Sequence, residues 1–138
     1  MLATLPPSIS PEVEQIQRMS AAGLRAFFNI TRSWQLKNEQ ELILLGQPSR
    51  SLYFKWKKNP ETAIPGKDTL ERISYVLGIY KALQILLPDP EAADAWVMKP
   101  NSAPLFGGHS ALERMLSGNV GDLYAVRQYL DAVRGGWA

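Results

Sequence analysis

The sequence contains no cysteine and a single histidine, His109, among its 138 residues. Disulfides, thiolate metal sites and cysteine nucleophiles are therefore excluded. One histidine cannot form a His–His metal pair or a histidine-based relay within one chain. Gly107-Gly108 lacks the lysine and the Ser/Thr of a phosphate-binding loop. We therefore expect a protein that is not an enzyme, with no catalytic residue, no metal site and no cofactor.

Long apolar segments are also absent. The longest uninterrupted apolar runs, such as Leu42–Leu45, contain four residues, whereas a membrane-spanning helix needs roughly 20. Residues 1–10 carry no basic segment ahead of an apolar stretch, so we expect no secretory signal. The length and the 46% hydrophobic content predict one compact domain, or two small ones that share a core. These features predict a cytoplasmic protein without membrane contact.

The net charge is small but unevenly distributed. Fifteen Lys and Arg residues against thirteen Asp and Glu residues give a formal charge of +2. Residues 1–67 carry +4 and residues 68–138 carry −2, and the segment 47–60 has four basic residues and no acidic one. A basic half followed by an acidic half is typical either of a protein with two different partners or of an ordinary solvated surface.

Apolar residues recur at helical spacing along nearly the whole chain, which predicts an all-α fold. Prolines, glycines and capping residues divide the chain into helices. Helices are expected to begin at Ser10-Pro11 (with a break at Gly23), Asn38, Ser49, Asp68, Asp89, Ser110 and Asp122. The organisation expected from these boundaries is an N-terminal arm and lead-in helix (1–19), a helix-turn-helix domain (20–66), and a helical domain with a C-terminal tail (67–138).

The segment 38–58 has the pattern of a helix-turn-helix, with a short capped helix, a tight turn at Gly46 and a second short helix. In that motif the N-terminal residues of the second helix reach base edges in the major groove. Leu52 and Trp56 are expected to face the core. The candidate DNA-binding residues are Ser49, Arg50, Ser51, Tyr53, Lys55, Lys57 and Lys58. An ordinary helical hairpin with exposed lysines is the alternative interpretation.

The expected helix 68–87 is apolar around most of its girth. Such a helix either lies in a core or has a second face buried by another chain. The second case predicts a homodimer, for which the candidate dimerisation residues are Val76, Ile79, Tyr80 and Leu83. A two-fold dimer would place two recognition helices about one turn of DNA apart on a palindromic operator.

Four stretches of the chain together resemble the Xre-type antitoxins of RES–Xre toxin–antitoxin pairs, whose C-terminus carries the MbcA/ParS/Xre toxin-binding region. They are NEQELILLGQPSRSLYFKWKK (38–58), ERISYVLGIYKALQILLPDPEAADAWVMKPN (71–101), FGGHSALERMLSG (106–118) and DLYAVRQYLDAVRGGW (122–137). Because they occur in the family's order, the resemblance covers about residues 20–138. One departure is Ser110-Ala111-Leu112, where the family often has Ser-Pro-Leu.

The resemblance implies a bacterial protein that binds operator DNA, often represses its own operon, forms a homodimer and holds a RES-domain toxin that consumes NAD⁺. In such pairs the antitoxin's C-terminal end approaches the active site of the toxin. The matching toxin-binding residues are Arg127, Arg134, Gly135, Gly136, Trp137 and Ala138. Trp137 either enters the toxin's pocket or packs on its own core. The alternative functions are a stand-alone helix-turn-helix regulator and a module that tethers a partner to a cell pole or chromosome site.

Overall fold

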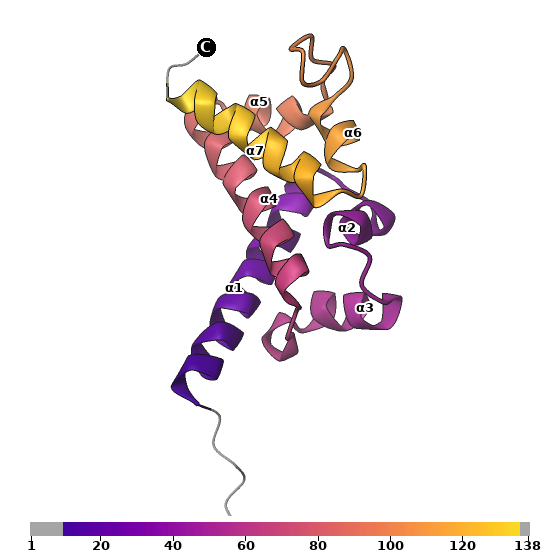
Figure 1. Cartoon of the computed structure of the whole chain (residues 1–138), viewed down its shortest axis with the longest axis vertical. Coiled ribbons are helices and arrows are strands. Elements are labelled where there is room, and N and C mark those ends of the chain that lie inside the picture. Colours follow the sequence, from indigo (N-terminus) through magenta and orange to yellow (C-terminus); the bar gives the residue numbers. More distant parts are fainter. Residues whose placement is uncertain (1–9, 136–138) are drawn as a thin grey trace, which may run out of the picture.

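The structure is a computed structural model in which residues 10–135 are described. This part of the chain is helical and holds no strand, only one isolated bridge between Pro100 and Ser110, so the all-α prediction is confirmed. None of its helices is both long and apolar enough to cross a bilayer. The elements in chain order (Figure 1) are α1 Pro11–Ser33, α2 Asn38–Leu44, α3 Arg50–Lys58, η1 Pro60–Thr62, α4 Lys67–Leu86, α5 Pro90–Ala95, η2 Trp96–Met98, α6 Ala111–Met115 and α7 Val120–Arg134.

Three helices begin at serines, as the sequence predicts. The hydroxyls of Ser10, Ser49 and Ser110 accept hydrogen bonds of 3.2, 3.3 and 3.1 Å from the backbone N–H three residues further on. Each bond satisfies a donor that the first turn of a helix leaves open. α1 continues through Gly23, so the predicted break there is wrong and the expected boundary at residue 20 falls inside a helix.

Two predicted capping side chains make tertiary contacts instead of capping their helices. α2 begins at Asn38, directly after its N-cap Lys37, whose N–H donates to the side chain of Gln40 at 2.8 Å. The Asn38 side chain accepts hydrogen bonds from α3. α7 begins two residues before Asp122, whose carboxylate pairs with Arg114 at 3.0 Å.

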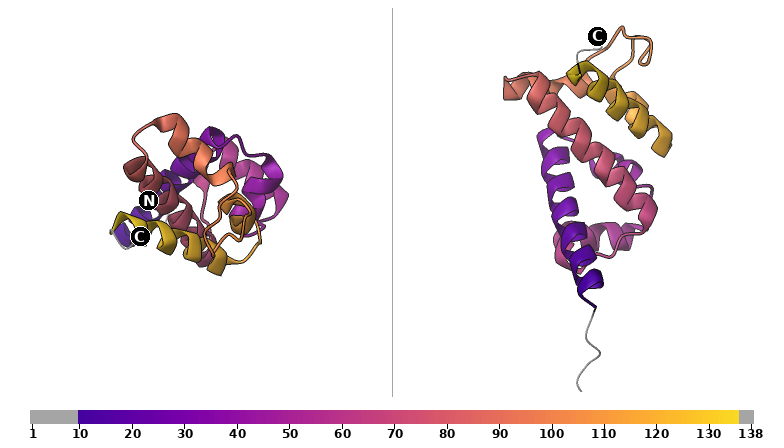
Figure 2. Two further views of the ribbon diagram at one scale, coloured as in Figure 1. Left: turned by 90° about the horizontal axis from the view of Figure 1, so that it is seen from above. Right: turned by 60° about the vertical axis from the view of Figure 1, so that its left-hand side comes forward.

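α4 is the central element of the fold. It packs against α1 on one side and against α7 on the other, while α2 and α3 lie to one side of the α1–α4 pair (Figures 1 and 2). A single hydrophobic core includes Phe27 from α1, Trp34 directly after α1, Ile79 from α4 and Val126 from α7. The N-terminal half of α1 extends beyond the rest of the molecule (Figure 1).

The position of α4 corrects three of the four predicted dimerisation residues and leaves Tyr80 as a candidate. The side chains of Val76, Ile79 and Leu83 are at most 1% exposed within one chain, so they offer no surface to a second copy. Tyr80 is half-buried, with its ring centre 6.3 Å from that of Trp34. The apolar girth of α4 is therefore largely explained by burial between two helices of its own chain.

Candidate functional site

α3 has one face toward the core and one toward solvent. Tyr53 and Trp56 point inward and are buried. Leu52 is 45% exposed, so its expected place in the core is wrong. The exposed residues on the opposite side form what we call the outer face of α3, namely Arg50, Ser51, Phe54, Lys55 and Lys58. Arg50, Phe54 and Lys58 are four residues apart and therefore lie along one stripe of the helix.

The two serines at the start of α3 have different surroundings. The Ser49 hydroxyl caps the helix by accepting the Leu52 N–H, and it lies 3.4 Å from the Ser51 hydroxyl. Both serines are exposed. Ser49 thus fixes where α3 begins, and Ser51 lies on its outer face.

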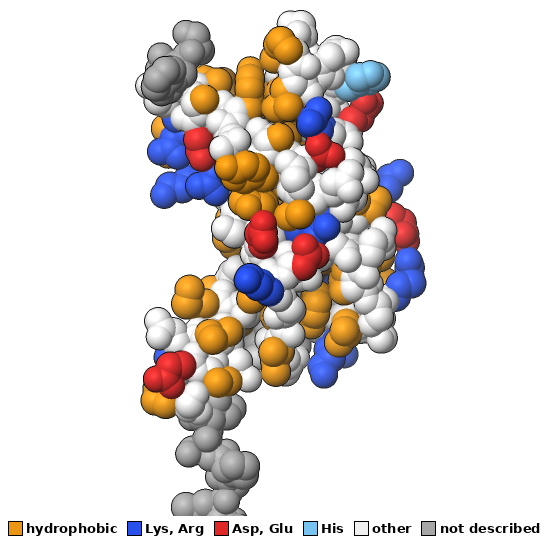
Figure 3. Space-filling view, in the orientation of Figure 1, with side chains coloured by type: hydrophobic (Ala, Val, Ile, Leu, Met, Phe, Trp, Pro, Cys, Tyr) orange, Lys and Arg blue, Asp and Glu red, His pale blue; other side chains and the backbone are white. Residues whose placement is uncertain are grey.

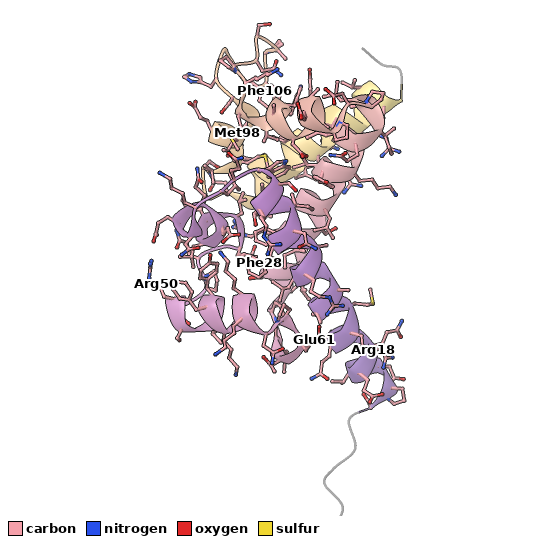
Figure 4. The ribbon with its side chains drawn as sticks, turned by 180° about the vertical axis from the view of Figure 1, so that it is seen from behind. Arg18, Phe28, Arg50, Glu61, Met98 and Phe106 are labelled. Carbon is pink, nitrogen blue, oxygen red and sulfur yellow. The ribbon has the colours of Figure 1, made fainter. Side chains whose placement is uncertain are left out.

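Arg50 is held near α2 by an exposed ion pair. Its Nη1 atom lies 2.9 Å from Oε1 of Glu39, and both side chains are more than half exposed. Figure 4 shows Arg50 at the end of α3 farthest from α1. Exposed ion pairs contribute little stability, so this guanidinium can exchange its partner for a ligand at small cost.

A buried carboxylate joins α3 to α1 and α2. Glu41 is only 3% exposed and accepts hydrogen bonds from the Thr31 hydroxyl, from the Tyr53 hydroxyl at 2.5 Å and from Lys57 Nζ at 2.7 Å. We call these four residues the Glu41 cluster. Burial, with a further contribution from the bond to Glu41, raises the pKa of Tyr53 above its usual value, so its hydroxyl remains a donor.

The Glu41 cluster corrects one of the predicted DNA-binding residues, Tyr53, which has no exposed surface. The ammonium group of Lys57 donates to both Glu41 and Asn38, but its side chain is 39% exposed, so its contact with DNA stays a prediction. Both side chains help to orient α3. Tyr53 and Lys57 are four residues apart, on the side of α3 that also carries the inward-facing Trp56. This spacing was the sequence signal for the direction of the two side chains. Sequence reasoning also missed Phe54, which is 45% exposed on the outer face.

The turn before α3 is fixed by α4. Gly46 has φ +88°, and a methyl group on it would lie 2.8 Å from Oδ2 of Asp68 and 2.9 Å from Nε of Arg72. The buried Arg72 pairs with Asp68 at 2.9 Å and donates to the carbonyl of Gly118 at 3.1 Å. One guanidinium therefore contacts both the turn that precedes α3 and the turn that precedes α7.

The predicted toxin-binding residues are distributed along and beyond α7. Arg127 lies across α4, since a methyl group on Gly78 would be 1.7 Å from its Nη1 atom, and its Nε donates to Asp131 at 2.9 Å. It is thus part of the α4–α7 contact. Arg134 is exposed in the last turn and Gly135 caps the helix. Gly136, Trp137 and Ala138 lie outside the described residues.

An aromatic cluster holds the 99–110 loop against α7. The ring of Phe106 meets those of Trp96 and Tyr129 edge-on, with centres 5.8 and 5.2 Å apart, and Trp96 stacks on Tyr129. His109 lies at the surface of this loop, 2.8 Å from Glu113. Within residues 10–135 no three metal-ligating side chains come together.

Comparison with known proteins assigns a family to both halves of the chain. Residues 16–78 match the antitoxin Xre-like helix-turn-helix domain, and residues 82–136 match the antitoxin Xre/MbcA/ParS C-terminal toxin-binding domain. A protein from Sinorhizobium fredii, named "Uncharacterized protein y4oB", is 52% identical over 115 residues, which cover 83% of this chain and 86% of the relative. The two matched regions meet inside α4. The chain therefore belongs to the Xre/MbcA/ParS family of antitoxins, with a helix-turn-helix domain followed by a toxin-binding domain.

Proposed function

We propose that this antitoxin neutralises a RES-domain toxin that consumes NAD⁺, and that as a dimer it represses its own operon. The observation that carries the proposal is that one helix, α4, connects the domain of the exposed basic helix α3 to a toxin-binding domain. The chain acts by binding, and the NAD⁺ chemistry belongs to the partner. The resemblance of residues 106–118 and 122–137 to RES-type antitoxins supports the choice of toxin.

The outer face of α3 supplies the chemistry for reading an operator. Arg50 can donate two hydrogen bonds to O6 and N7 of guanine, which is the commonest specific contact in the major groove. Phe54, one turn further on, can contact the methyl group of thymine. Lys55 and Lys58 carry the positive charge that neutralises phosphates.

Replacing Arg50 with alanine is expected to weaken operator binding by about 1–3 kcal/mol and to relax the preference at one base pair. Lys58→Ala is expected to weaken binding to all duplexes alike, and to reduce the slope of log affinity against log salt by about one. Fluorescence anisotropy with an operator selected from random duplexes measures both effects. Lys99→Ala, an exposed lysine outside α3, is the control. Unchanged affinity in both α3 variants would remove α3 from the interface.

The toxin assignment is tested by co-purification. The tagged antitoxin is expressed together with the RES-domain protein encoded in the neighbouring reading frame, and the complex is expected to survive 0.5 M salt. A second sample in which Arg50 is alanine is expected to retain the toxin, because α3 is separate from the matched toxin-binding region. Failure of both samples to retain the RES protein would favour a stand-alone regulator. Such a regulator would still bind its operator.

A further inference from the structure

An apolar groove runs between α1 and α4, on a side of the molecule away from the outer face of α3. Two adjoining hollows of about 400 and 310 Å³ share Leu77. The first is lined mainly by Ile16, Met19, Leu70 and Ile73, and the second continues past Ala26, Ile30 and Tyr80. We call the two hollows together the α1–α4 groove.

The N-terminal half of α1 exposes an apolar strip beside the lower end of this groove. Val13, Ile16 and Met19 are 45, 54 and 65% exposed. Figure 3 shows hydrophobic side chains along this extending part of the helix. Clustered exposed apolar residues of this kind are a common mark of a protein interface.

We propose that the α1–α4 groove receives the N-terminal half of α1 from a second copy of this chain, in a two-fold dimer. The strip and the groove adjoin each other and share Ile16 and Met19, so one two-fold operation places each strip in the other copy's groove. An unrelated partner would have to supply both a ridge and a groove of matching shape. This inference rests on the proposed function in one respect: that function assumes a dimer, and the inference names the surface through which the dimer forms.

The charges at the two ends of this arrangement are complementary. The first turn of α1 carries Glu12 and Glu14, and the turn of α4 beyond Leu77 and Tyr80 carries the exposed Lys81. An antiparallel pairing of the two α1 helices brings the acidic tip of one copy toward this basic end of the other. A parallel pairing would place the two acidic tips side by side.

Gly23 gives an independent reason to expect close contact at this place. Glycine inside a helix is unfavourable relative to alanine. A methyl group on Gly23 would lie 3.5 Å from Cγ2 of Ile73, an ordinary contact distance, so the packing of the single chain does not require glycine. The close approach of a second helix accounts for it.

The mass of the full-length protein, measured by light scattering after gel filtration without DNA or toxin, tests the proposal. The wild-type chain is expected to show twice the mass of one chain at micromolar concentration. Met19→Lys is expected to raise the dimer dissociation constant at least about thirtyfold. Met98→Lys is the matched control, since Met98 is 42% exposed and lies far from the part of α1 marked by Arg18 in Figure 4.

Gly23→Ala separates dimer contact from folding. It is expected to weaken the dimer about tenfold, because the added methyl groups crowd the crossing helices. In a Met19→Lys background it is expected to leave the melting temperature unchanged or higher, because alanine favours the helix. A dimer that tolerates both substitutions would place the interface elsewhere.

Two other outcomes would overturn the proposal. One is a wild-type protein that is still monomeric at about 100 µM, a concentration well above the dissociation constant expected of a specific dimer. The other is a dimer that forms only after residues 1–9 are deleted, which would mean that the chain's own N-terminal segment covers the groove. Deletion of residues 1–9 is expected to leave the dimer intact. A monomeric wild-type protein would also contradict repression by a dimer, whereas a dimer with its interface elsewhere would overturn this inference alone. None of these results bears on whether the chain binds its toxin.

Discussion

A chain that lacks residues 136–138 is expected to bind operator DNA normally and to fail to neutralise the toxin. Arg134 is exposed in the last turn of α7 and Gly135 caps the helix, so the deletion removes none of the residues that form the described core. Folding and α3 should therefore be unaffected. From the resemblance to RES-type antitoxins, we propose that this end of the chain reaches the toxin's active site. Growth of cells that co-express the toxin, with anisotropy as the DNA-binding control, measures the expected separation.

A point substitution makes the same test sharper. Trp137→Ala is expected to weaken toxin binding by about 2–4 kcal/mol, the effect typical of a buried aromatic anchor at an interface. Tyr124→Ala is the matched control, since Tyr124 is an exposed aromatic residue at the other end of α7. Full protection by the Trp137 variant and the truncated chain would move inhibition onto the helices of 90–133.

Replacing Glu41 with leucine is expected to lower the free energy of unfolding by about 3 kcal/mol. The change leaves the buried hydroxyls of Thr31 and Tyr53 without their acceptor and separates Lys57 from its carboxylate. Because Lys57 is partly exposed, its charge can be solvated, which keeps the cost below that of a fully buried pair. Urea denaturation measures the shift in midpoint.

The control for this change lies two residues away on the same helix. Glu39→Leu removes an exposed carboxylate that pairs with Arg50, and it is expected to change stability by less than about 0.5 kcal/mol. The Glu41 variant should also bind the operator more weakly at temperatures where it is folded, because Tyr53 and Lys57 orient α3. Equal destabilisation by the two variants would contradict a special role for the Glu41 cluster.

Local signals account for the parts of the fold that the sequence predicts correctly. A serine cap depends on atoms within three residues, so Ser10, Ser49 and Ser110 mark helix starts whatever the tertiary structure is. Asn38 and Asp122 are also good capping residues. Their side chains contact other helices instead, and such contacts have no local signature.

The candidate site is predicted only in part, because the direction of a side chain on a short helix depends on its neighbours. The basic residues of 50–58 locate α3, but which of them face outward follows from the packing of Tyr53 and Trp56 against the core. Lys57 turns toward a carboxylate that α2 buries, and nothing in the basic stretch itself indicates this.

The dimer residues illustrate a different difficulty. A helix that is apolar all round predicts burial on two faces, but the sequence does not say whether the second cover comes from the same chain. In α4 the side of Val76, Ile79 and Leu83 is covered by the chain itself. The side of Leu70 and Leu77 lines the α1–α4 groove. The position of α7 in the fold is needed to tell which of these two sides the chain itself covers.

The most direct test of the antitoxin function measures NAD⁺ consumption by the purified RES-domain protein from the neighbouring reading frame. With an equimolar amount of this chain, the rate is expected to fall to background. The Arg50→Ala variant is expected to inhibit equally well, because Arg50 lies outside the matched toxin-binding domain, residues 82–136. An undiminished rate in the presence of excess wild-type chain would contradict the account.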